Sequence, residues 1–159
     1  MGASIDSDQN TGGKTGDLVN YVFQILYDTN DIDDAIKTIL EIVGRRFDVS
    51  RAYVFENSFC GNYADNTYEW CNEGIIPQKE FLQQYPYEKV EGYKDLFRDN
   101  SVFYCRDIHS LTPAQSRLFE SQGICSTLQC ALYDDKEFCG FIGFDECTGC
   151  LLYTSDAAD

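Results

Sequence analysis

The stretch STLQCALYDDKEFCGFIGFD, residues 126–145, decides the fold. Two runs of strand-forming residues lie on either side of Asp-Asp-Lys at 134–136. Such runs joined by a short polar turn are typical of an antiparallel β-hairpin. Gly140 and Gly143 in the second run allow another backbone to approach closely. We therefore expect 126–145 to form two paired strands of a sheet.

Further strands are predicted upstream of this hairpin, at 51–56, 67–71 and 102–108, with a turn-rich loop at 59–66. Side chains alternate between the two faces of a strand. In the segment 67–71, Tyr68 and Trp70 therefore lie on one face, and Glu69 and Cys71 on the other.

Helices are predicted where apolar residues recur every three or four positions. Residues 17–27 show this period, with Thr15 as a candidate N-cap, and so do residues 31–46, where Asn30 or Asp31 is the candidate cap. A third helix opens at Thr112-Pro113 and ends at Gly123.

The longest stretch without a strand signal is 72–100, in which 78–84 and 93–97 are predicted to be short helices. Connections of this length often carry binding function or cover a pocket. The order of elements is two helices, a hairpin, this long excursion, one strand, a helix and a second hairpin. That order predicts an α+β fold with a mostly antiparallel central sheet of five to six strands, flanked by helices.

The composition excludes several classes of protein. The 159 residues carry a net charge of −15, which disfavours binding to nucleic acid and to anionic membrane surfaces. No run of 18 apolar residues and no secretory signal is present in the sequence. We therefore expect a cytoplasmic protein, whose eight cysteines are reduced.

No constellation of residues predicts catalysis or metal binding. His109 is the only histidine, and hydrolytic triads and zinc centres need a histidine with oriented partners. The C-x-x-C sequence at 147–150 has no second pair. Paired acids such as Asp134 and Asp135 fall in turns and caps. We expect no enzyme activity, no catalytic residue, no metal and no cofactor.

Four stretches resemble GAF domains of bacterial signalling proteins. They are FDVSRAYVFE at 47–56, NTYEWCNEGI at 66–75, QGICS at 122–126 and GFIGFD at 140–145. The resemblance covers residues 17–147 and implies a GAF/PAS-like sensor domain. In this family such domains precede a diguanylate cyclase, a histidine kinase or a phosphodiesterase module.

The resemblance also implies the organisation of the chain. We expect a disordered lead-in at 1–16, the sensor domain at 17–147 and a non-native-looking tail at 148–159. The tail reads like a translated sequencing adapter, and the alternative is an ordinary frayed terminus. The expected protein is thus truncated at its C-terminus, without its closing helix and fused output domain.

In a GAF-like sheet one face would form the ligand pocket, and the candidate residues are those that the predicted elements supply. They are Tyr53, Phe55, Tyr68, Trp70, Tyr104, Arg106, Phe119 and Phe141. Arg106 and Arg51 are candidate anchors for an anionic group. Because strand residues alternate, only about half of the rings can face a pocket. The alternative is that all of them are simply core.

Two functions stay open at this point. The first is a sensory domain that binds an unknown small molecule, forms a homodimer through its N-terminal helices, and controls cyclic-di-GMP synthesis or a histidine kinase. The second is a structural dimerisation module without a ligand. A covalent bilin is not expected, because Cys105 is followed by Arg106 and the chain has no Cys-His pair.

Overall fold

The computed structural model describes residues 11–147, with side chains from residue 16 onward. The expected tail and the first ten residues of the expected lead-in lie outside the described residues. Residues up to Ile39 and residues from Leu40 onward form two compact units. No helix among the described residues has the length and apolarity needed to cross a membrane.

The first unit contains helix α1 (Thr11–Asp28) and the beginning of helix α2 (Ile32–Phe47). Helix α1 begins at Thr11 rather than at Asp17, so Thr15 lies inside the helix and does not cap it. The physical reason is that adding a residue to a formed helix is much easier than nucleating one. Asp31 caps α2 as predicted, because its Oδ1 accepts a hydrogen bond of 2.9 Å from the Asp33 backbone N–H.

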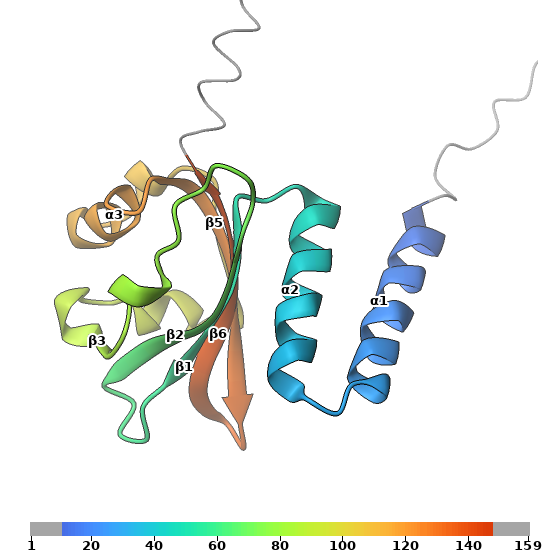
Figure 1. Cartoon of the computed structure of the whole chain (residues 1–159). Helices are drawn as coiled ribbons and strands as arrows, with labels where there is room; N and C mark the ends of the chain where they lie inside the picture. The colour runs from blue at the N-terminus through green and yellow to red at the C-terminus, as the bar shows by residue number, and fades with distance from the viewer. Residues whose placement is uncertain (1–10, 148–159) are drawn as a thin grey trace, which may run out of the picture. The chain divides into compact units, whose positions relative to one another are not determined.

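The second unit is built on a six-stranded sheet in which every hydrogen-bonded pair of strands is antiparallel. The strands are β1 (Arg51–Asn57), β2 (Tyr63–Cys71), β3 (Tyr85–Pro86), β4 (Val102–Cys105), β5 (Ile124–Asp134) and β6 (Glu137–Cys147). They lie in the order β3-β2-β1-β6-β5-β4 (Figure 1). The prediction of an α+β fold with an antiparallel sheet of five to six strands is confirmed.

Two strand boundaries differ from the prediction by more than two residues. Strand β2 begins at Tyr63, inside the expected loop, because Tyr63 and Ala64 pair with β3 and supply an extra stretch of sheet. Strand β4 ends at Cys105 rather than Ile108, because Asp107 caps a short 3-10 helix, η4 (Ile108–Ser110), by accepting a hydrogen bond from the His109 backbone N–H.

The long excursion and the third helix cover one face of the sheet (Figure 1). The excursion forms single 3-10 turns, η1 (Lys79–Phe81), η2 (Tyr87–Lys89) and η3 (Lys94–Phe97). Helix α3 (Pro113–Glu120) begins with a capping box between Thr112 and Gln115. After it, Gly123 adopts a φ of 73°, the left-handed conformation expected of a helix-ending glycine.

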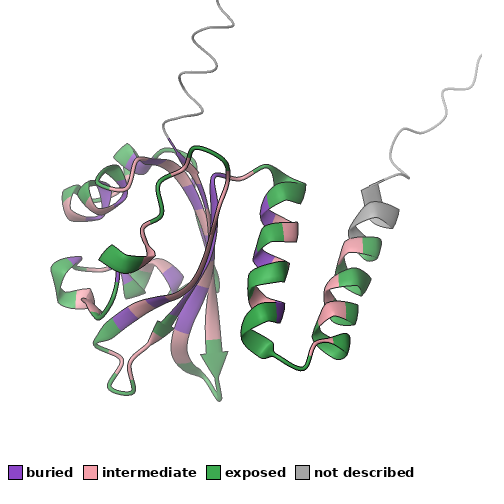
Figure 2. Ribbon diagram, viewed as in Figure 1, coloured by how far each residue is buried: buried purple, intermediate pink, exposed green. Residues whose placement is uncertain are grey.

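The two faces of the sheet have different neighbours, and register assigns side chains to them. Cross-strand partners share a face, so Tyr53 and Glu69 point one way while Ala52 and Trp70 point the other. We call the side of Tyr53 the pocket face and the side of Trp70 the outer face. Buried residues are concentrated on the strands, and all of Arg51–Phe55 in β1 is buried (Figure 2).

Candidate functional site

A cavity of about 50 Å³ lies on the pocket face, between the sheet, the excursion and α3. Most of its lining is apolar or aromatic. The lining residues are Tyr53, Phe55, Ala64, Leu82, Tyr85, Tyr87, Val90, Tyr93, Leu118, Phe119, Gln122, Ile124, Gln129 and Phe141. Typical ligand pockets measure about 300–1,000 Å³, so this cavity is much smaller than most of them.

Closely packed rings keep the cavity small. Phe55 and Phe141, on neighbouring strands, stack with ring centroids 4.8 Å apart and an interplanar angle of 11°. Tyr93 from the excursion reaches over them, with its ring centroid 5.8 Å from that of Phe141. Movement of Tyr93 would therefore widen the cavity directly.

Polar side chains form a buried hydrogen-bonded chain beside these rings. The Tyr93 hydroxyl donates to Gln129 Oε1 at 2.6 Å, and Gln129 Nε2 donates to the Tyr53 hydroxyl at 2.9 Å. The Tyr53 hydroxyl donates in turn to Asp145 Oδ1 at 2.8 Å, which also accepts from Thr127 Oγ1 at 2.7 Å. The chain links the excursion to β1, β5 and β6.

Burial shifts the pKa values of the titratable side chains in this hydrogen-bonded network. The pKa of Asp145 is raised to about 6, because burial disfavours the carboxylate more than the hydrogen bonds from Thr127 and Tyr53 favour it. Burial also raises the pKa of Tyr53 and that of Tyr93 well above their ordinary value. Both tyrosines therefore remain hydrogen-bond donors across the physiological pH range.

Arg51 lies at the far end of the same face, beside Asp145 across the β1–β6 pairing. Its side chain is buried, and Nη2 donates to the Gln122 carbonyl oxygen. Its Nε and Nη1 atoms have no hydrogen-bond partner among the described residues. Leaving a buried donor without a hydrogen-bond acceptor costs stability. The charge of the Arg51 guanidinium supplies positive potential at this end of the face.

Gly143 makes room for the ring of Tyr53. A Cβ atom at Gly143 would lie 2.2 Å from Tyr53 Cε2, which is closer than two non-bonded carbon atoms can approach each other. Gly143 is the cross-strand partner of Tyr53 in β6. The glycine of the GFIGFD stretch thus lets Tyr53 lie across β6 and reach Asp145.

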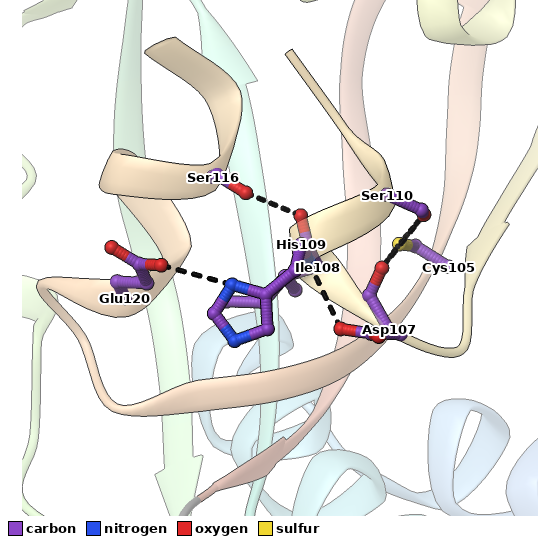
Figure 3. Close-up of polar contacts among 7 residues, drawn as sticks. All are labelled: Cys105, Asp107, Ile108, His109, Ser110, Ser116 and Glu120. Atoms are coloured by element: carbon purple, nitrogen blue, oxygen red, sulfur yellow. Dashed lines mark hydrogen bonds and ion pairs between the residues drawn. The ribbon is translucent and has the colours of Figure 1, made fainter. Parts of the chain in front are cut away.

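A second set of polar contacts joins α3 to the connection that precedes it (Figure 3). Ser116 Oγ, in α3, donates to the Ile108 carbonyl oxygen, and His109 Nδ1 lies 3.0 Å from Glu120 Oε1. In the same connection, Ser110 Oγ donates to the Asp107 carbonyl oxygen at 2.7 Å. These contacts hold Phe119, which is 2% exposed, against the cavity.

Four of the residues predicted for the pocket line this cavity: Tyr53, Phe55, Phe119 and Phe141. The structure places three of the other four on the outer face and the fourth in a separate depression.

Tyr68 and Trp70 lie on the outer face, where the Trp70 ring packs against Gly44 in the last turns of α2. Tyr104 also lies on the outer face, since it pairs with Leu128 next to Phe144, and its side chain is 66% exposed. Arg106 lines a separate surface depression together with His109 and Glu120.

Sequence reasoning missed the polar chain and the tyrosines of the excursion. A signal for these hydrogen-bonded side chains was present in the sequence. Thr127 and Gln129 are polar residues two positions apart on β5, and Asp145 is the cross-strand partner of Thr127 on β6. Polar residues on a face predicted to be buried indicate an internal hydrogen-bond network. Tyr85, Tyr87 and Tyr93 carry no periodic signal, since they lie in irregular backbone.

No sequence profile of a known protein family matches the chain. It is similar to the methanogenesis regulatory histidine kinase FilI of Methanothrix harundinacea, with 30% identity over 136 residues. This alignment covers 82% of the chain but only 14% of that kinase, so the chain spans about one seventh of its curated relative.

Solved structures with a similar fold include chromophore-binding domains. The chromophore-binding domain of a Stigmatella aurantiaca bacteriophytochrome matches 91% of the chain and 55% of that protein chain, with a TM-score of 0.72 and 13% identity. The match to a phycocyanobilin-bound GAF domain from a cyanobacterial phytochrome covers 91% of this chain and 81% of the GAF domain's chain, with a TM-score of 0.69 and 10% identity. The chain therefore has the fold of a GAF domain, as the four sequence stretches implied.

Proposed function

We propose that this chain is the small-molecule sensory domain of a cytoplasmic sensor histidine kinase, and that the domain itself catalyses no reaction. The observation that carries the proposal is the cavity, which is lined by rings and joined to a buried network of polar side chains. A few polar groups converging on a mostly apolar pocket are characteristic of ligand sites. The name of the 30% identical relative supports a kinase rather than a diguanylate cyclase as the output.

The polar chain offers a route from the ligand to the sheet. A ligand that enters the cavity must displace Tyr93 or pack against it, and either event alters the hydrogen bond from Tyr93 to Gln129. Gln129 contacts Tyr53, and Tyr53 contacts Asp145 near the end of β6. Ligand binding would thus shift the population between two arrangements of these hydrogen-bonded side chains.

The size of the cavity bears on the kind of ligand. The solved relatives include a GAF domain bound to phycocyanobilin and a protein bound to biliverdin. A cavity of about 50 Å³ is far below the volume of a typical ligand pocket. The proposed ligand is therefore smaller than a bilin, and only part of it enters the enclosed space.

A thermal-shift panel of metabolites and cyclic nucleotides tests the proposal. A ligand that binds only the folded protein raises the melting temperature as its concentration rises. Leu118→Trp fills the mouth of the cavity, because Leu118 is half-buried in its lining, and should abolish the shift without unfolding the protein. A flat panel, or shifts that Leu118→Trp leaves unchanged, would contradict the proposal.

A ligand-free dimerisation module is the second candidate, and α1 supports it. Val19, Phe23 and Tyr27 recur on one face of α1 and are 47%, 66% and 90% exposed. Exposed apolar residues at this spacing are typical of a helix that pairs with another helix. Sedimentation at increasing concentration tests it, with Phe23→Glu as the variant that should remain monomeric. A concentration-dependent dimer with a flat ligand panel would favour this candidate.

A further inference from the structure

A depression outside the cavity contains two cations and no acid. It measures about 360 Å³ and adjoins the cavity, because Tyr85, Val90 and Leu118 line both spaces. The other lining residues of the depression are Lys89, Ala114, Arg117 and Ser121. Since the chain carries 27 acids and 12 bases, a depression lined by two basic side chains and no acidic one is unusual on this surface.

Both cations are available to a ligand. The ion pairs of the described residues involve other basic side chains, so neither Lys89 nor Arg117 is neutralised by a carboxylate there. Lys89 Nζ lies 5.5 Å from the ring centroid of Tyr85, which places its charge beside a wall shared with the cavity. The two side chains are exposed and lie on η2 and α3.

The neighbouring depression on the other side of Val90 has the opposite charge. It also adjoins the cavity, through Tyr87, Val90 and Tyr93. Its charged lining residues are Glu88, Glu91, Lys94 and Asp95. Three carboxylates against one ammonium group repel an anion, so an anionic ligand would approach the cavity only from the side of Lys89 and Arg117.

The enclosed space favours an aromatic group as the part that enters. Its walls include seven phenylalanine and tyrosine rings, and offset or edge-on contacts between rings add to the gain from burial. Because the cavity measures about 50 Å³, a ring enters it only when Tyr93 moves aside, and the remainder of the ligand lies in the larger depression outside. The ring and the charged group therefore belong to opposite ends of one small molecule.

We propose that the domain recognises small aromatic carboxylates, with the ring entering the cavity and the carboxylate lying with Lys89 and Arg117 in the depression. This inference rests on the proposed sensory function and adds the class of ligand. The apolar cavity supplies the gain from burying the ring, and the two cations supply charge-assisted hydrogen bonds. Such a site discriminates an acid from its neutral amide.

Phenylacetate and phenylacetamide are the matched probes, since they share the ring and differ in charge. Dissociation constants are measured by NMR titration of the isotope-labelled protein. We expect phenylacetate to bind at least roughly tenfold more tightly than the amide, as hydrogen bonds to charged groups allow. Added salt should weaken the binding of the acid and leave that of the amide unchanged, because exposed charges are screened.

The double variant Lys89→Gln/Arg117→Gln tests the two cations, and Arg106→Gln/Lys136→Gln is its matched control. Both remove two exposed positive charges, but only the first changes the depression beside the cavity. We expect the first to remove the preference for phenylacetate and the control to retain it. An equal effect of both variants, or equal affinities of the wild type for acid and amide, would overturn the assignment.

The outcomes separate this inference from the proposed function. Binding of phenylacetamide at the cavity with no preference for the acid overturns the anion preference and leaves a ligand-binding domain. The same holds if neither probe binds while other compounds of the metabolite panel do so. If no compound of either set binds, both proposals are wrong.

Discussion

The Tyr93 hydroxyl donates a hydrogen bond of 2.6 Å to Gln129 Oε1, across 36 positions of sequence. Tyr93 belongs to the excursion and Gln129 to β5, so this bond connects the covering layer to the sheet at the cavity. Both side chains are buried, which makes the bond a structural tie as well as a candidate sensing element.

Tyr93→Phe should destabilise the domain by about 1–3 kcal/mol, because the buried Gln129 oxygen loses its donor while the ring remains. Urea denaturation measures the change. Tyr104→Phe is the control, since Tyr104 is 66% exposed on the outer face, and its effect should stay within about 0.5 kcal/mol. Equal effects of the two variants would show that the hydroxyl contact contributes nothing.

Asp145 predicts a specific dependence of stability on pH. Its pKa is raised from 3.8 in the reference state to about 6 in the fold, so the folded protein binds this proton more tightly than the unfolded chain does. The resulting stabilisation is complete below pH 3.8 and is lost as the pH rises through about 6.

Comparison with Asp145→Asn isolates this contribution from other titrating groups. The free energy of unfolding of the wild type, relative to that of the variant, should fall by about 3 kcal/mol from the shift of 3.8 to about 6. Parallel stability curves for the two proteins between pH 4 and pH 7 would show that Asp145 titrates normally.

Gly143→Ala should destabilise the domain and displace Tyr53, because the new Cβ would lie 2.2 Å from the Tyr53 ring. The expected cost is about 1–3 kcal/mol, which is typical of overpacking. Gly16→Ala in α1 meets no atom within 4 Å and should instead be neutral or gain up to about 1 kcal/mol. Thermal denaturation of both variants checks the opposite signs.

Thr112→Ala removes one half of the capping box at α3. Loss of such a cap costs about 0.5–2 kcal/mol, and fraying of α3 would loosen Leu118 and Phe119 in the cavity wall. Thr38→Ala, at an exposed position inside α2, should change stability by less than about 0.5 kcal/mol. Hydrogen exchange of α3 amides distinguishes local fraying from global loss of stability.

Cys60 should be the most reactive thiol among the described residues. It is exposed, and a hydrogen bond from Ser58 lowers its pKa, whereas burial raises the pKa of Cys147 to about 11. Since the thiolate is the reactive form, iodoacetamide should label Cys60 faster than Cys147, as site-resolved mass spectrometry can measure. Similar labelling rates at the two sites would contradict this expectation.

The strands and helices were predictable because each has a period that local chemistry fixes. The hairpin of β5 and β6 was evident from Asp134 to Lys136, and α3 from Thr112-Pro113 and Gly123. Strand β3 was not predictable, since two residues carry no period and Tyr85 pairs with Ala64 only after the chain has folded. The start of α1 was missed because the glycines before Asp17 have a low helix propensity, although the helix extends through them to Thr11.

Half of the residues predicted for the pocket line the cavity, because side-chain alternation could be read from the sequence but the choice of face could not. Alternation correctly separates Tyr53 and Phe55 from the residues between them, but it does not say which face the excursion covers. Trp70 is as aromatic as Phe141, yet the last turns of α2 occupy its face of the sheet. The choice between the two faces depends on long-range packing, which single-strand patterns do not encode.

The edges of the sheet have a consequence for how copies of this domain associate with one another. One edge is β3, only Tyr85–Pro86, and proline cannot donate to another strand; the other is the four-residue β4. Unprotected edges recruit strands from other molecules and seed aggregation. Because both outermost strands are this short, pairing between copies through β3 or β4 would form only a few backbone hydrogen bonds.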